Sequence, residues 1–235
     1  MVRGAAQRID RAGVECTQRG VGEDVHHGTR LDPRGGVRPD QQPARERGCV
    51  RVIAGVAKVH PLKAARTGSV RPTSDLVRGA IFNMIGPYFS EETRVLDLYA
   101  GTGAMGIEAL SRGAAWADFV EQEARSCAAI EENLQRTGFA DRALVHNGTV
   151  ARALNRISDS YALIILDPPY AQPVDQDVIV KLIEGNILEP DGQLVLERST
   201  RTTDALDFPD LHLVKQRRHG DTMVWVFIRE GARIG

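Results

Sequence analysis

Residues 94–110 read RVLDLYAGTGAMGIEAL, and this stretch decides the fold class. A largely apolar run opens it and predicts a buried strand. Gly101, Gly103 and Gly106 follow, and apolar residues then recur at helical spacing. Glycine allows a positive φ and lets the backbone approach a ligand without a Cβ clash, so this turn is a candidate binding loop. A dinucleotide site and a plain tight turn show the same pattern, so the glycines alone leave the ligand open.

Strand and helix candidates alternate outward from this unit. We predict strands at 94–99, 116–121, 143–147, 161–166, 193–198, 211–216 and 222–228, and helices at 73–85, 104–113, 124–137, 149–157 and 174–185. Such alternation predicts an α/β fold with a doubly wound, Rossmann-like parallel sheet that binds ligands beyond the carboxyl ends of its strands. Only residues 217–221 separate the last two strands, which predicts an antiparallel hairpin at the sheet edge.

Three domains are predicted along the chain. Residues 1–49 contain no Phe, Tyr, Trp, Lys, Ser or Asn, and their apolar residues are isolated. We expect them to be a disordered tail or a segment upstream of the true start, with translation beginning at Val50; an Arg-rich arm that folds on RNA is the alternative. Residues 50–72 read as a β-hairpin extension and residues 73–230 as the main domain.

Composition excludes several classes of protein. The formal net charge of -1 leaves nucleic-acid binding to local clusters. Apolar stretches such as Ala162–Leu166 are far too short to cross a bilayer, and no secretion signal opens the chain. The 3 cysteines form no CxxC pattern and lie at no ligand spacing from the histidines. We therefore expect a cytoplasmic protein with no membrane segment and no metal.

Two acids favour S-adenosylmethionine as the ligand of the glycine loop. Asp97 lies inside the end of the strand, four residues before Gly101. A carboxylate there suits a ligand with a sulfonium and an ammonium group, and it is awkward beside a pyrophosphate. Glu121 ends the next strand, where an acid can accept hydrogen bonds from both ribose hydroxyls.

The strand at 161–166 runs into Asp167, Pro168, Pro169 and Tyr170, and we predict that these four residues are catalytic. An aromatic exocyclic amine is a poor nucleophile because its lone pair is delocalised. A carboxylate and the Pro168 carbonyl can accept its two N–H bonds and free the lone pair for attack. The prolines stiffen the turn and Tyr170 offers a face on which a base stacks. A proline-rich strand terminator with a surface Asp and Tyr is the structural alternative.

Residues 50 to about 229 resemble the bacterial 16S rRNA guanine-N2 methyltransferases of the RsmD family, which modify guanine 966. The matching pieces are RVIAG, RPTSDLVRGAIFN, VLDLYAGTGAMGIEALSRGA, FVE, DPPY and the closing GDT. The resemblance implies a seven-stranded methyltransferase fold with a small N-terminal extension for RNA. It implies a catalytic Asp167, S-adenosylmethionine as cofactor, and the 2-amino group of a guanine in 16S rRNA of an assembling 30S subunit as the acceptor. We expect a monomer.

The resemblance adds cofactor contacts from Arg71, Thr73 and Asp75. The full predicted cofactor site is Arg71, Thr73, Asp75, Asp97, Tyr99, Ala100, Gly101, Thr102, Gly103, Glu121, Gln122, Asn147, Gly148 and Thr149.

The sequence departs from the family pattern at three places. VAKVHPLKA replaces a glycine- and Arg-rich stretch after RVIAG, and Gly79 follows Arg78 where the family often has Glu. Gly148 stands where the family places Asn or Asp toward the adenine amine, and Asn147 is the alternative contact.

Positive charge gathers in residues 51–78, where Asp75 is the only acid. This cluster can neutralise phosphates, and a solvated basic face is the alternative. We predict RNA contacts from Arg51, Lys58, Lys63, Arg66 and Arg78. A second, smaller cluster is Lys215, Arg217, Arg218 and His219.

Three other functions compete with RNA methylation. A DNA adenine or cytosine amino-methyltransferase shares the glycine loop and DPPY, but it usually needs a separate domain that reads sequence. A protein-glutamine methyltransferase usually has NPPY, which Asp167 argues against. A non-catalytic RNA-binding module on the same fold is the third, and the intact Asp167, Gly101 and Glu121 argue against it.

Overall fold

The structure, a computed structural model, describes residues 50–63, 73–86, 89–169, 176–201, 206 and 208–231. The chain divides into two units, 1–49 and 50–235, and all described residues belong to the second. The predictions for residues 1–49 and for the start at Val50 therefore lie outside the described residues, as do Arg66, Arg71 and Tyr170.

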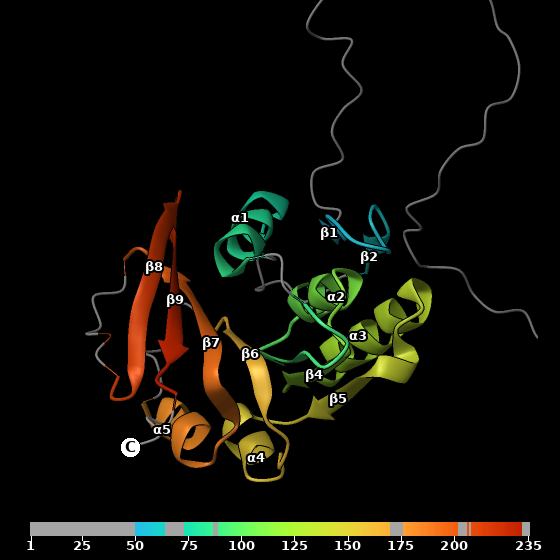
Figure 1. Cartoon of the computed structure of the whole chain (residues 1–235). Helices are drawn as coiled ribbons and strands as arrows, with labels where there is room; N and C mark the ends of the chain where they lie inside the picture. Colours follow the sequence, from blue (N-terminus) through green and yellow to red (C-terminus); the bar gives the residue numbers. More distant parts are fainter. Residues whose placement is uncertain are drawn as a thin grey trace, which may run out of the picture. The chain divides into compact units, whose positions relative to one another are not determined.

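Seven of the described strands form one mixed sheet in the order β5-β4-β3-β6-β7-β9-β8 (Figure 1). The parallel strands are β3 (Arg94–Leu98), β4 (Trp116–Glu121), β5 (Ala143–Asn147), β6 (Tyr161–Leu166) and β7 (Leu188–Ser199). β9 (Thr222–Arg229) and β8 (Leu211–His219) add an antiparallel hairpin at one edge. The predicted doubly wound α/β fold is confirmed.

The strand order changes direction between β3 and β6. From β3 the chain adds β4 and β5 on one side, and it then returns to place β6 on the other side of β3. The connection after β3 runs toward one edge of the sheet and the connection after β6 runs toward the other edge. A crevice therefore forms outside the carboxyl ends of these two strands. The glycine turn follows β3 and Asp167 follows β6, which brings both sequence motifs to this point.

Helices cover both faces of the sheet (Figure 1). α1 (Asp75–Ile85), α2 (Ala104–Ser111) and α3 (Ala124–Thr137) pack over one face, and their buried Ile81, Ile107 and Ile130 share an apolar cluster with sheet residues. α4 (Val150–Leu154) and α5 (Gln176–Glu184) pack over the other face. Both faces are buried because the central strands are almost continuously apolar, as parallel strands covered by helices require.

The predicted element bounds agree at α3, β4, β5 and β6 and differ elsewhere. α4 ends at Leu154, three residues early. β7 begins at Leu188 rather than at 193, because a register shift in its pairing with β6 accommodates the turn-like residues Pro190, Asp191 and Gly192. β8 runs on to His219, so the hairpin turn is shorter than we predicted.

The N-terminal extension is anchored on α2. β1 (Val50–Arg51) and β2 (Pro61–Leu62) pair antiparallel, as the sequence predicted. Between them the backbone N–H groups of Ile53 and Ala54 donate to the buried Glu108 carboxylate at 2.7 and 3.0 Å. A buried carboxylate that accepts several hydrogen bonds holds its partners firmly, so this part of the extension is fixed against the main domain.

None of the helices in the described part of the chain is long and apolar enough to span a membrane.

Candidate active site at the carboxyl ends of the parallel strands

Acidic side chains mark the carboxyl ends of four neighbouring parallel strands. In chain order they are Asp97 in β3, Glu121 at the end of β4, Asp167 directly after β6 and Glu197 in β7. The strand order places them along one edge of the sheet, at and beside the point where the strand order reverses. This is the edge at which open α/β sheets bind their ligands.

Three of these acids share one face of the sheet. Side chains alternate along a strand, so Asp97, Asp167 and Glu197 point to the same face as the residues two positions before them. Those residues are Val95, Ile165 and Val195, which belong to the apolar cluster under α1, α2 and α3. The acids therefore continue a buried apolar layer at its end.

The glycine turn has the backbone strain that its sequence requires. Gly101 and Gly103 have φ of 55° and 73°, and Tyr99 has a φ of 63° although it is not a glycine. Gly103 caps α2 and its N–H donates to the Ala100 carbonyl at 2.7 Å. A left-handed non-glycine residue costs free energy, so the surrounding structure must hold Tyr99 in this conformation.

Two acids hold this turn in place. The Gly106 N–H donates to Asp97 Oδ2 at 2.9 Å, and the Gly101 N–H donates to Glu121 Oε2 at 2.9 Å. Glu121 Oε1 accepts a second bond from the Glu123 N–H at 2.8 Å. Burial raises the pKa of Asp97 to about 8, and the charges of Asp167 and Glu121 add to the rise. The geometry around the loop is thus set by carboxylates.

Predicted cofactor residues on β5 also contact the loop after β4. The Asn147 amide donates to the carbonyls of Glu121 and Gln122, each at 3.3 Å, and the Gly148 N–H donates to the Glu121 carbonyl at 2.9 Å. Thr149 caps α4 through its side chain. Thr102 is held by its carbonyl, which accepts from Asn133 at 3.0 Å. The structure therefore connects Glu121, Gln122, Asn147 and Gly148 in one loop region, whereas Thr102 is held from α3.

Asp167 lies beside Glu197, which the sequence analysis did not predict as a site residue. Thr73 Oγ1 lies 3.3 Å from Asp167 Oδ2 and 3.2 Å from Glu197 Oε2. Burial raises the pKa of both carboxyls, and the charge of Asp167 raises the pKa of Glu197 further. Thr73, predicted from the resemblance alone, thus contacts the catalytic candidate directly.

A signal for Glu197 was present in the sequence. The run QLVLE ends in Glu197, just as Asp97, Glu121 and Asp167 end the apolar runs of the other strands. No motif surrounds this acid, so the sequence pattern alone predicts an ordinary strand residue. Its exposed fraction of 3% shows that it is part of the interior.

Arg78 corrects our prediction of the RNA surface. Its side chain is fully buried, its Nη2 lies 2.9 Å from Asp75 Oδ1, and it also donates to the Arg51 carbonyl. A buried guanidinium that is paired with acids is not available to phosphate, so the predicted RNA contact of Arg78 is wrong for this structure. Asp75 in turn pairs with Arg51 at 3.1 Å, and these contacts give it a structural role at the start of α1.

The remaining predicted RNA contacts differ in their surroundings. Lys58 and Lys63 are both exposed, and Lys63 pairs with Glu132. Arg66 lies outside the described residues, together with the predicted Arg71 and Tyr170. Pro168 is buried and Pro169 is exposed, so the two prolines after Asp167 differ in their surroundings.

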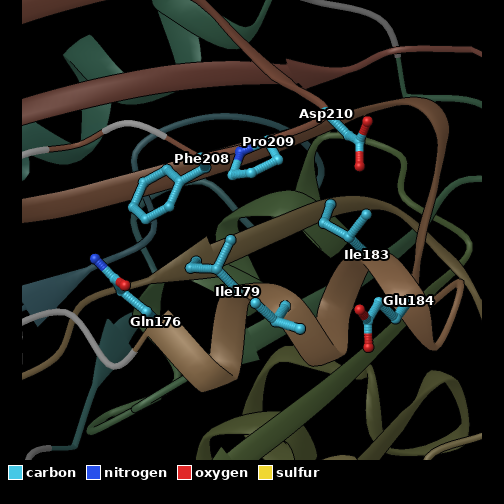
Figure 2. A pocket seen from close by; sticks show the side chains of 8 residues that line it. Gln176, Ile179, Ile183, Glu184, Phe208, Pro209 and Asp210 are labelled. Atoms are coloured by element: carbon cyan, nitrogen blue, oxygen red, sulfur yellow. The ribbon is translucent and has the colours of Figure 1, made fainter.

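The hollow shown in Figure 2 is separate from these acids. It measures about 160 Å³ and is lined by α5 and by Phe208, Pro209 and Asp210. Its wall is mostly apolar, and no member of the strand-end acid group lines it. We therefore place the candidate site at the strand ends and not in this hollow.

A glycine turn after the first parallel strand and an acid-proline turn after the strand beside it, on this sheet, define the class of Rossmann-like methyltransferases. Residues 50–228 match the family model described as "Conserved hypothetical protein 95". The chain belongs to this family, which is the RsmD family that its sequence motifs resemble.

Named relatives agree with this class. The chain is 36% identical over 185 residues to "Putative rRNA methyltransferase YlbH" of Bacillus subtilis, a match that covers 77% of this chain and 100% of the relative. It is 32% identical over 150 residues to "Ribosomal RNA small subunit methyltransferase D" of Escherichia coli, covering 64% and 72%. A solved structure titled "Putative methyltransferase yhhF from Escherichia coli" superposes with a TM-score of 0.70 at 27% identity, covering 78% of this chain and 99% of that chain.

Proposed function

We propose that this chain transfers a methyl group from S-adenosylmethionine to the 2-amino group of a guanine in 16S rRNA, at position 966 by family resemblance. The observation that carries the proposal is the position of Asp167. It follows β6 directly, and its backbone N–H lies 3.5 Å from the carbonyl of Leu98 in the neighbouring β3, whose end carries the glycine turn. A methyl donor held at the turn and an amine held at Asp167 would therefore meet.

The residues at the turn fit S-adenosylmethionine. A Cβ built on Gly101 would have no non-neighbouring atom nearer than the Tyr99 carbonyl at 4.0 Å, so the loop backbone is open to close approach by a ligand. Glu121 is placed to accept from ribose hydroxyls, and each of its oxygens keeps a lone pair beyond the one that the backbone uses. The bound cofactor would supply an electrophilic methyl group on sulfur.

Asp167 would act on the acceptor. Its carboxylate and the Pro168 carbonyl would accept the two N–H bonds of the amine and direct the nitrogen lone pair toward the methyl carbon. Transfer of the methyl group would leave the acceptor nitrogen with a positive charge until it loses a proton. Asp167 would then accept the proton that the nitrogen loses, and general base catalysis of this kind contributes roughly 10²–10⁴-fold.

The β8–β9 hairpin is the described basic surface that best suits RNA. Seven residues of β8 in a row, 212–218, are exposed, and Arg217 and Arg218 lie next to the turn. Ser199 of β7 pairs with Thr222 of β9, so this turn lies beside the carboxyl end of β7 and hence beside the acids. Phosphates of an unstacked guanine loop would meet these cations as the base reaches Asp167.

The experiment compares a deletion strain with its parent. The proposal requires loss of 2-methylguanosine at one position of 16S rRNA in the deletion strain and its return on expression of this chain. Purified protein is then offered labelled cofactor with 30S particles, naked 16S rRNA or DNA. Methylation of DNA alone would support a DNA amino-methyltransferase instead, and no transfer to any of the three would support the non-catalytic RNA-binding module. The monomeric state and the cytoplasmic location belong to this proposal as well.

A further inference from the structure

Glu197 and Asp167 form a buried carboxyl pair joined by one hydroxyl group. Leu166 of β6 pairs with Leu196 of β7, so the next residues, Asp167 and Glu197, come side by side at the strand ends. Thr73 Oγ1 lies between them, 3.3 Å from Asp167 Oδ2 and 3.2 Å from Glu197 Oε2. Thr73 is 94 positions from Asp167 and 124 from Glu197 along the chain, so this contact belongs to the tertiary fold.

The Thr73 hydroxyl can donate a hydrogen bond to only one ionised carboxylate at a time. A threonine has one O–H to donate and two lone pairs to accept with, so two ionised carboxylates would compete for the same proton. Two like charges at this separation in a buried setting also repel strongly. One extra proton resolves both problems, since a protonated carboxyl donates to Thr73 while Thr73 donates to the other carboxylate.

The surroundings decide which carboxyl holds the proton. Glu197 has an exposed fraction of 3%, whereas Asp167 is partly exposed at the open end of the sheet. Burial disfavours the charged form, so the more buried carboxyl is the better place for the proton. The raised pKa of Glu197, caused by burial and by the charge of Asp167, agrees with this assignment.

Charged groups on the neighbouring elements do not reverse this choice. On β9 the residue opposite Glu197 is the apolar Val224. On β3 the nearest acid is Asp97, whose pKa burial raises to about 8, so near neutral pH it adds little charge beside the pair. On α1, Arg78 donates from Nη1 to the Thr73 carbonyl at 3.5 Å, but Asp75 and Glu108 balance its charge.

We propose that Glu197 is a positioning residue for methyl transfer: as a protonated carboxyl it donates to Thr73, which in turn donates to Asp167 and holds that side chain ionised and oriented toward the acceptor amine. This inference rests on the proposed function for its activity readout. It assigns to Glu197 no contact with substrate. Deprotonation of Glu197 would turn the Thr73 hydroxyl away from Asp167 and place a second negative charge beside it.

The activity test uses Glu197→Gln and Glu197→Ala in the full chain. A glutamine amide donates to Thr73 as the protonated carboxyl does, but it does not titrate. We expect kcat of the unaltered protein to fall as the pH rises through the alkaline range, and Glu197→Gln to stay within about three-fold of it near neutrality and to lose the alkaline fall. Glu197→Ala should lose about ten-fold or more in kcat near neutrality, where the unaltered protein holds the proton, with little change in the KM for cofactor.

Thr73 provides the matched control. Thr73→Ser keeps the bridging hydroxyl and should retain the pH profile, whereas Thr73→Val removes the hydroxyl and should resemble Glu197→Ala in kcat. If Glu197→Gln is as impaired as Glu197→Ala at all pH values, or keeps the alkaline fall unchanged, the positioning role is wrong.

Two measurements do not need turnover. The infrared difference spectrum between the unaltered protein and Glu197→Gln at neutral pH should show the carbonyl band of one protonated buried carboxyl, separate from any band of Asp97, which both proteins keep. Because the folded protein keeps this proton above the ordinary glutamate pKa, the unaltered protein should lose stability as pH rises, and Glu197→Gln should lose less. Absence of the band would overturn the proton assignment even in an active enzyme. If no RNA is methylated at all, the proposed function fails, while these two measurements still decide whether the shared proton exists.

Discussion

The two halves of the strand-end edge use their carboxylates differently. On β3 and β4, Asp97 and Glu121 accept from backbone N–H groups of Gly106, Gly101 and Glu123. On β6 and β7, the carboxyl groups of Asp167 and Glu197 both lie within hydrogen-bond distance of the Thr73 hydroxyl. In the half formed by β3 and β4, the carboxyl oxygens accept hydrogen bonds that fix the shape of the glycine loop. In the half formed by β6 and β7, the two neighbouring carboxyl groups keep lone pairs that a substrate can use, as a group that takes up a proton requires.

The difference teaches how one row of acids supports two tasks. A loop that binds a cofactor must be shaped before the cofactor arrives, and hydrogen bonds from its backbone amides to acidic side chains do this well. A group that accepts hydrogen bonds from a substrate must not be saturated by the protein. The following experiments test this contrast, from the largest expected effect to the smallest.

Replacement of Asp167 tests the reactive half. Asp167→Ala removes the acceptor of the amine proton, so kcat should fall by roughly 10²–10⁴-fold. Cofactor affinity, measured by calorimetry, should change by no more than a few-fold, because the glycine turn is held by the other acids. Asp167→Asn keeps the shape and should be as inactive. Near-normal turnover in either variant would remove Asp167 from the mechanism.

Replacement of Glu121 tests the loop half. Glu121→Ala removes the two backbone contacts and the predicted ribose acceptor, so we expect the Kd for cofactor to rise about 10- to 100-fold. At saturating cofactor, kcat should stay within a few-fold. The contrast between the two halves breaks down if Glu121→Ala lowers kcat as strongly as Asp167→Ala while cofactor still binds.

Replacement of Gly106 tests whether the loop half is also the rigid half. A Cβ on Gly106 would lie 2.3 Å from Phe119 Cε1, so Gly106→Ala should lower the free energy of unfolding by about 1–3 kcal/mol. Gly79→Ala is the matched control, because Gly79 is also helical and a Cβ there meets only Ile53 Cδ1 at 3.9 Å. Urea denaturation measures both. Equal free energies of unfolding for the two variants would show that the structure around Gly106 adjusts to a Cβ, and that this half is not rigid.

Replacement of Arg217 and Arg218 tests whether RNA reaches the acid pair from the hairpin side. Each Arg→Ala change should weaken RNA binding a few-fold and lower the slope of log affinity against log salt by about one. Arg156→Ala, an exposed cation at the amino end of β6, serves as control and should leave binding unchanged. If Arg156→Ala has the larger effect, RNA approaches from another side.

Much of the architecture followed from local pattern. The glycine turn, the DPPY turn and most strand cores were predictable because alternation and strand-end residues report on a few neighbours at a time. Glu121 and Asp167 were found in this way, and the structure places them at the expected edge. The chain's membership of the RsmD family agrees with motifs that are each short and local.

By itself, the sequence determined the α/β class, the order of strands and helices along the chain, and the two turns that carry the site. Only the tertiary structure decided that Glu197 and Thr73 join Asp167, and that Arg78 is buried in ion pairs and not exposed to RNA. The reason is physical: strand neighbours are chosen by the packing of the whole sheet. A pair such as Thr73 and Glu197, 124 positions apart, leaves no periodic trace in either segment.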